Sequence, residues 1–228
     1  MDRSVFDYIR VCTNSQMNMR NLIICLLGLT LSLHARGQTK VTSDAQKNII
    51  EKIDKSVSAW TSMQCEFTQT KSMKMLKKDM VSKGMMYYKQ PNQLRWQYTS
   101  PYDYVFVLNN DKVRIMSAKT TKNISVQENK MFRQITGIIL KCVTGDGLKN
   151  TSDFTVEVYQ ADKSYFAKLY PKKKELKQIY SVIELHFNPS LTMVSSIKMV
   201  EKTGDVTWVR LSNVKPNATV NEKLFDVN

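Results

Sequence analysis

The chain is poor in glycine, histidine and cysteine, and each shortage excludes a kind of chemistry. Only seven glycines occur among 228 residues, and they form neither a Walker phosphate loop nor a dinucleotide-binding pattern. The chain has two histidines and four cysteines, and no His, Cys or carboxylate pair falls at a recognised metal-ligand spacing. We therefore expect no cofactor, no metal centre and no nucleotide chemistry.

Long hydrophobic runs are also lacking. The most apolar stretch, residues 22–33, is about a dozen residues long, whereas a helix needs roughly 20 to span a bilayer. It follows Arg20 and precedes Ala35-Arg36-Gly37, a small-residue cleavage motif. This pattern predicts a secretory signal peptide over residues 19–37. Residues 1–18 contain acidic side chains that do not fit a signal peptide, and we interpret them as a mis-assigned N-terminal extension.

The predicted mature protein is a single domain of residues 38–228. Lipoprotein signals place a cysteine directly after the cleavage motif, but Cys25 lies inside the apolar run and no cysteine lies near Gly37. We therefore expect a soluble, exported protein that is not lipid-anchored. Cys65 and Cys142 remain after cleavage, and two alternatives stay open for them: one disulfide bridge, or two buried small apolar side chains.

An enzyme is not expected from the remaining residues. The only nucleophilic pair available would combine Cys65 or Cys142 with His186 as the base. No motif that activates a thiol surrounds either cysteine. Paired carboxylates on strands, such as Asp153 and Glu157, are better explained as solvated surface.

Positive charge dominates the chain, with 34 Lys and Arg against 20 Asp and Glu. This balance favours anionic partners without selecting one of them. Five lysines gather in residues 71–83, around an expected hairpin. Because an exported protein rarely meets nucleic acid, we expect none as a partner, and an anionic membrane surface suits the basic stretch better.

Alternation of apolar and polar residues predicts many short strands after residue 63. Turn signals such as Gln90-Pro91-Asn92 separate the strands. The expected strands begin at residue 63 and continue at 81–89, 93–99, 103–109, 112–118, 123–127, 153–160, 164–170, 180–188, 193–201 and 206–214. The apolar pair Phe225 and Val227 could close one more.

Two helices are expected beside these strands. Residues 43–61 carry one apolar stripe at helical spacing, and residues 129–142 carry a second one. The fold class is therefore mainly β with helices: a single curled antiparallel sheet that forms a closed or half-open barrel, with helices over its open face.

Several motifs in fixed order resemble a known family. The motifs are Phe67-x-Gln69, residues 84–98, Pro101, residues 104–108 with the turn Asn110-Asp111-Lys112, and later residues 166–172, 176–187 and 221–227. In order and spacing they resemble the periplasmic outer-membrane lipoprotein carrier family, LolA. The resemblance covers essentially all of residues 43–228.

The resemblance implies an incomplete β-barrel lidded by helices around a hydrophobic cavity. It further implies a periplasmic carrier, acting as a chaperone in outer-membrane lipoprotein sorting, that binds the acyl chains of lipoproteins and shuttles them from the inner to the outer membrane. The implied partners are acylated lipoproteins, an inner-membrane lipoprotein-releasing ABC transporter and an outer-membrane acceptor, and the carrier would be a monomer. The alternative is a periplasmic module of the same fold that binds or senses another lipid or a glycolipid.

Strand alternation and the second helix supply candidate walls for such a cavity. The candidate ligand-binding residues are Phe67, Met86, Tyr88, Leu94, Trp96, Met131, Phe132, Ile135 and Ile139. Flexible methionines tolerate ligands of varied shape, as acyl chains are. The alternative is that the same residues fill a closed core.

Two polar residues are candidates for control of the lid. Members of the family commonly carry an arginine before the proline of the second turn, whereas this chain has Gln90 there and Arg95 nearby. We expect Gln90 and Arg95 to control closure of the lid, with Gln90 giving a weaker closed state than an arginine would.

Overall fold

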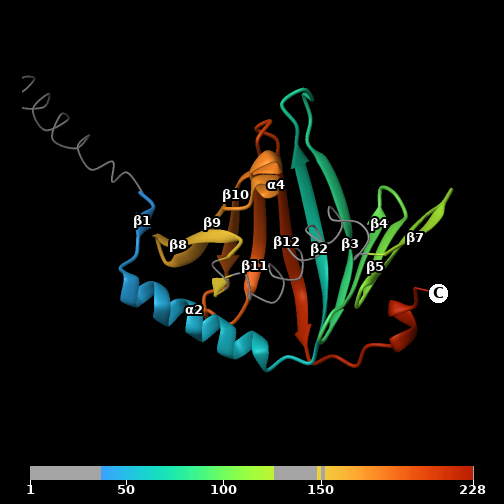
Figure 1. Ribbon diagram of the computed structural model, residues 1–228, viewed down its shortest axis with the longest axis horizontal. Helices are drawn as coiled ribbons and strands as arrows, with labels where there is room; N and C mark the ends of the chain where they lie inside the picture. The colour runs from blue at the N-terminus through green and yellow to red at the C-terminus, as the bar shows by residue number, and fades with distance from the viewer. Residues whose placement is uncertain (1–36, 126–147, 150–151, 228) are drawn as a thin grey trace, which may run out of the picture. The chain divides into compact units, whose positions relative to one another are not determined.

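The computed structural model describes residues 37–125, 148–149 and 152–227. The chain divides into two compact units, Met1–Gly37 and Gln38–Asn228, and every described strand and helix belongs to the second unit. The described strands form one 12-stranded antiparallel sheet (Figure 1). The expected helix at 129–142 and almost all of the expected signal peptide lie outside the described residues.

The sheet is open, since its order begins at one edge with β1 and ends at the other with β7. The strands are β1 (Thr39–Lys40), β2 (Ser62–Ser72), β3 (Met80–Lys89), β4 (Gln93–Ser100), β5 (Tyr104–Asn109), β6 (Lys112–Ser117), β7 (Thr121–Ser125), β8 (Phe154–Ala161), β9 (Ser164–Pro171), β10 (Tyr180–Phe187), β11 (Val194–Glu201) and β12 (Val206–Pro216). Their order is β1-β8-β9-β10-β11-β12-β2-β3-β4-β5-β6-β7. This confirms the predicted fold class of a mainly β protein built on one unclosed antiparallel sheet.

Strand alternation gives the sheet two different faces. Phe67, Met86 and Trp96 lie buried in the main hydrophobic cluster, and we call the face that carries them the core face. The opposite side, which we call the outer face, carries the intervening residues, for example Arg95 and Val107. The predicted strands agree with the observed bounds to within about two residues, because a period of two is a local property of the chain.

Helix α2 (Ser43–Ser58) covers part of the core face. The Thr42 side chain caps its N-terminus by accepting from the Ala45 amide at 3.3 Å. Ile53 and Val57 are buried in the main cluster. The Gln46 side chain bonds to β8 backbone groups, so the helix is fixed to the sheet by polar as well as apolar contacts. The first predicted helix is thus confirmed, although it ends three residues before residue 61.

The C-terminal apolar pair does not form the extra strand that alternation allowed. Residues Glu222–Phe225 form a 3-10 helix, η3, and Phe225 and Val227 pack on the outer face against Val107. Side chains satisfy backbone carbonyls of this segment, because Arg95 donates to Leu224 and Asn109 donates to Phe225. A further helix, α4 (Lys174–Ile179), precedes β10. No helix in the described part of the chain is both long and apolar enough to cross a bilayer.

Candidate functional site

The core face of β2, β3 and β4 forms a continuous apolar wall. Strand register places Met86 beside both Cys65 and Trp96, and Tyr88 beside Leu94. The exposed fractions are 1% for Phe67, 0% for Met86, 4% for Tyr88, 0% for Leu94 and 8% for Trp96. The structure therefore brings together five of the nine residues proposed from the sequence. The other four, Met131, Phe132, Ile135 and Ile139, lie outside the described residues.

Aromatic rings extend the wall along the sheet. The ring centroid of Phe67 lies 4.6 Å from that of Trp96 and 5.1 Å from that of Tyr98, whose ring lies 5.9 Å from Tyr104. These are separations of favourable tilted or edge-to-face pairs. Gly84 permits the arrangement, since a Cβ there would lie 1.9 Å from the Gln97 carbonyl oxygen and 2.7 Å from Phe67.

The wall leads into an open pocket of about 420 Å³ at the end of the sheet where β4 turns into β5. Its lining residues are Met80, Ser82, Tyr98, Ser100, Tyr102, Asp103, Tyr104 and Ser117. Met80 is 43% exposed and Tyr102 is 67% exposed, so apolar side chains stand at its mouth. The volume lies within the range of about 300–1,000 Å³ that is typical of small-molecule sites.

The two tyrosines of the pocket are partly buried, and this burial raises the pKa of both phenols. Burial raises the pKa of Tyr98, and the hydrogen bond with Gln69 partly opposes that rise. Burial also raises the pKa of Tyr104. Both phenols therefore stay neutral at physiological pH, which suits a pocket for an uncharged apolar group.

None of the residues that line this pocket is among the nine candidates proposed from the sequence, although a signal for two of them existed. Met80 and Ser82 lie six and four residues before Met86 on β3. Because alternate residues of a strand lie on the same face, the alternation that places Met86 on the core face also places Met80 and Ser82 there. Tyr104 and Ser117 pair across β5 and β6, and their position beside Tyr98 depends on the order of the strands.

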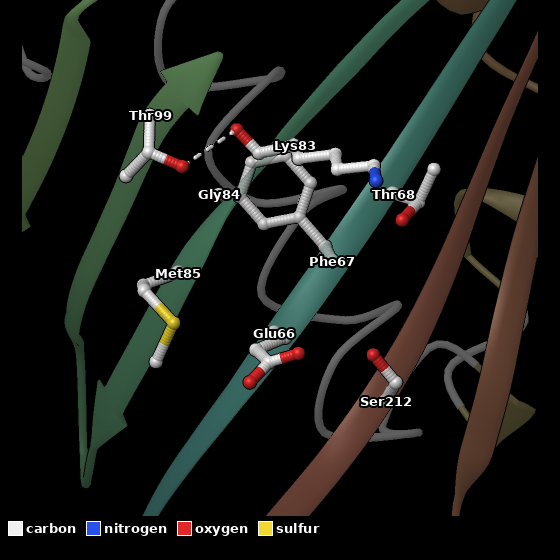
Figure 2. A pocket seen from close by; sticks show the side chains of 8 residues that line it. All are labelled: Glu66, Phe67, Thr68, Lys83, Gly84, Met85, Thr99 and Ser212. Atoms are coloured by element: carbon white, nitrogen blue, oxygen red, sulfur yellow. Dashed lines mark hydrogen bonds between the residues drawn. The ribbon is translucent and has the colours of Figure 1, made fainter.

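A second, more polar pocket of about 300 Å³ lies between β12, β2, β3 and β4. Figure 2 shows its lining, where the Phe67 ring lies beside Gly84. The other lining residues are Glu66, Thr68, Lys83, Met85, Thr99 and Ser212. The Thr99 hydroxyl donates to the Lys83 carbonyl oxygen at 3.4 Å. Charged and hydroxyl groups dominate this lining, so it is less suited to an apolar ligand than the tyrosine pocket.

The candidate lid residues lie near the C-terminal segment. The Arg95 guanidinium is on the outer face, where it donates to the Leu224 carbonyl at 3.1 Å and to Gln97 at 3.0 Å. Lys89 forms an ion pair with Glu222. The Gln90 side chain is exposed, and the Gln90 backbone N–H donates to the Thr61 carbonyl oxygen at 2.9 Å. Arg95 and Lys89 thus both engage the C-terminal segment, while the helix that Gln90 and Arg95 were expected to control lies outside the described residues.

The structure separates the residues of the alternative thiol site. Burial raises the pKa of Cys65 to about 12, with the Glu66 charge adding to the rise, so the thiol stays protonated. Cys65 belongs to the main cluster on the core face. His186 lies on the outer face of β10, stacked between Phe166 at 5.0 Å and Trp208 at 5.8 Å. Cys65 and His186 therefore cannot act as a dyad, and Cys142 lies outside the described residues.

Glu184 contacts His186 of the stacked rings on the outer face. Glu184 Oε2 lies 3.4 Å from both His186 Nε2 and Lys198 Nζ. The hydrogen bond with His186 lowers the pKa of Glu184, and the Lys198 charge adds to this effect, while burial opposes it. Among the described residues, no group of three or more His, Cys, Asp and Glu side chains is arranged to hold a metal ion.

These features define a class: mainly β proteins built on one open antiparallel sheet whose apolar face leads into a pocket. Within that class the chain belongs to the LolA family, because residues 58–228 match the family described as "Outer membrane lipoprotein carrier protein LolA". The resemblance inferred from the motifs is thereby confirmed. The description names a carrier protein and no catalytic activity.

Relatives and solved structures extend this comparison. An "Outer-membrane lipoprotein carrier protein" of Legionella pneumophila (strain Lens) is 26% identical over 147 residues, which are 64% of this chain and 69% of the relative. The chain is similar to the crystal structure of a LolA superfamily protein from Nitrosomonas europaea, with 14% identity, a TM-score of 0.45, and coverage of 79% of this chain and 97% of that one. It is also similar to the Mycobacterium tuberculosis lipoprotein LppX, with 12% identity, a TM-score of 0.46, and coverage of 79% and 99%.

Proposed function

We propose that the protein is a periplasmic carrier that binds the acyl chains of lipoproteins and shuttles them from the inner to the outer membrane. One observation carries the proposal: the apolar wall of the core face continues into a pocket of about 420 Å³ whose mouth is open. A closed core would bury Met80 and Tyr102, yet these residues are 43% and 67% exposed. Membership of the LolA family and the name of the Legionella relatives support the same function.

The physical need for a carrier follows from the chemistry of the cargo. Each methylene exposed to water costs about 0.8 kcal/mol, so an acyl chain does not leave a membrane unaided. The rings of Tyr98 and Tyr104 and the thioether of Met80 offer apolar contact without a fixed shape. Apolar contacts that depend little on direction suit a carrier, because the carrier must release its cargo at the outer membrane.

The proposal includes processing and partners. Residues 19–37 would be removed as a signal peptide, with residues 1–18 as an extension outside the natural start, leaving the domain 38–228. Cargo would come from an inner-membrane lipoprotein-releasing ABC transporter and pass to an outer-membrane acceptor, with the carrier acting as a monomer.

Control of the lid forms part of the same proposal. The predicted helix at 129–142 would cover the core face, with Met131, Phe132, Ile135 and Ile139 completing the cavity. Arg95 and Lys89 already engage the C-terminal segment, whereas the Gln90 side chain is exposed, so Gln90 is the candidate that we propose for contact with the lid. A neutral amide there would hold the lid less firmly than a charged side chain.

Native mass spectrometry of the protein purified from its own periplasm tests the function. A bound mass that matches an acylated lipoprotein is the expected result. A bound phospholipid or glycolipid would replace this function with the alternative of a lipid-binding or sensing module of the same fold. A second experiment depletes the protein from the cell, and outer-membrane lipoproteins should then remain in the inner membrane. Normal sorting of these lipoproteins after depletion would contradict the proposed transport function.

A further inference from the structure

The hairpin between β2 and β3 exposes large apolar side chains. In the loop at residues 73–79, Met75 is 93% exposed and Leu76 is 47% exposed. At the start of β3, Met80 is 43% exposed and Val81 is 50% exposed. Soluble proteins rarely expose neighbouring apolar side chains in this way unless the patch contacts a partner or a membrane.

Lysines surround this apolar group. Lys74, Lys77 and Lys78 lie exposed in the same loop, and Asp79 is the one acidic residue between positions 71 and 83. Aliphatic side chains bordered by lysines are typical of segments that enter the interface of an anionic membrane. Protein interfaces favour methionine, but they also favour aromatic residues and arginine, which residues 73–81 lack, and they are depleted in lysine. The composition therefore favours a lipid surface over a protein partner.

The base of the loop is fixed to the adjacent turn between β11 and β12, which reduces the entropy that binding would cost. The Lys74 amide donates to Asp205 Oδ1 at 3.0 Å, and the Leu76 amide donates to the Met73 carbonyl at 2.9 Å. The Lys74 side chain also lies over Gly204, where a Cβ would come within 2.2 Å of it. Figure 1 shows the β2–β3 hairpin extending past the ends of the neighbouring strands.

We infer that the β2–β3 hairpin docks the protein on the surface of an anionic phospholipid bilayer. Met75 and Leu76 enter the interface between headgroups and acyl chains, and Lys77 and Lys78 lie against the anionic headgroups. Because Met80 both adjoins the loop and lines the tyrosine pocket, docking brings the pocket mouth toward the lipid. The inference rests on the hairpin and holds whichever apolar ligand the pocket takes.

Co-sedimentation with vesicles tests the inference on protein purified from the periplasmic fraction. Wild-type protein is expected to bind vesicles that mix phosphatidylglycerol with phosphatidylcholine, and to bind pure phosphatidylcholine much more weakly. The double substitution Lys77→Gln with Lys78→Gln should weaken binding about 25-fold, since each lysine near an anionic surface contributes about fivefold. The matched control, Lys52→Gln with Lys55→Gln on α2, changes the net charge equally and should leave binding nearly unchanged.

A second variant tests the apolar contribution. Met75→Asp with Leu76→Asp is expected to reduce vesicle binding at least about tenfold, because two apolar side chains no longer enter the interface. Each variant is also titrated with a fluorescent fatty acid, which reports on the tyrosine pocket. Lost vesicle binding with retained fatty-acid binding supports docking by the hairpin.

Several results would overturn the inference. One is that wild type and both hairpin variants bind vesicles equally well. Another is that the α2 control loses as much vesicle binding as the lysine variant of the hairpin. A third is that wild-type protein binds an acidic protein through the hairpin but does not bind anionic vesicles. A wild-type protein that binds vesicles through the hairpin but takes up no fatty acid would contradict the proposed carrier function and leave the docking inference in place.

Discussion

Filling the tyrosine pocket should weaken acyl-chain binding without disturbing the sheet. Ser82 is half-buried on the core face of β3, opposite Gln69 on β2, and it lines the pocket with Tyr98 and Tyr104. Ser82→Trp places an indole ring in an open space of about 420 Å³. Because the pocket is open, the ring has room, and we expect the free energy of unfolding to change by less than about 1 kcal/mol.

The magnitude follows from the apolar surface that the ring displaces. If the indole excludes about three methylenes of an acyl chain, at about 0.8 kcal/mol each, binding loses about 2.4 kcal/mol. That loss corresponds to an increase of about fiftyfold in Kd. A short acyl chain, which does not reach the blocked part of the pocket, should lose less affinity than a long one.

Titration with fluorescent fatty acids of two chain lengths measures this effect. The matched control is Val81→Trp, which adds the same ring at the adjacent position on the outer face, where the side chain is already 50% exposed. The control should bind like wild type. An unchanged Kd in Ser82→Trp, with the variant folded, would refute the assignment of this pocket to acyl chains.

Three further predictions concern other parts of the molecule. Phe225→Ala should lower the free energy of unfolding in urea by about 3 kcal/mol, because a fully buried ring is lost, yet fatty-acid binding on the opposite face should persist; a parallel loss of binding would argue against separate faces. Glu184→Gln should be about 1 kcal/mol less stable than wild type at pH 7. Because the folded-state pKa of Glu184 is lowered, its stabilisation is present above the unfolded pKa and is lost as pH falls through the folded one. The difference in stability between wild type and variant, measured by urea denaturation, should therefore close as the pH falls below about 4.3. A difference that does not depend on pH would contradict the charge argument. Gln90→Arg should slow cargo release and increase hydrogen-exchange protection of residues 129–142, and unchanged protection would rule out lid control by Gln90.

Local sequence patterns were sufficient to predict most elements and one wall of the candidate site. Alternation placed Phe67, Met86 and Trp96 on a common face, since successive side chains of a strand point to opposite sides. The apolar stripe of α2, with Ile53 and Val57, was predicted in the same way from helical spacing. These predictions needed no knowledge of which strands pair.

The sequence could not assign the partners of polar side chains far along the chain. Arg95 was expected to act on a lid, but in the structure it donates to Leu224, which lies 129 residues away. Nothing in the residues around Arg95 specifies that carbonyl. The same holds for Phe225, whose apolar character fitted a strand equally well as a 3-10 helix packed on the outer face.

The sequence by itself determined most of the strands, helix α2, their apolar faces and the family, because each depends on periodicity or on motifs within short segments. Only the tertiary structure decided the strand order, which sets β12 beside β2 and joins Tyr98, Tyr104 and Ser117 around one pocket. It also decided that Met75 and Leu76 stay exposed at the end of a hairpin. Many strands of the same alternating pattern can pair with one another, so contacts between distant segments are fixed by the packing of the whole sheet rather than by any single stretch of sequence.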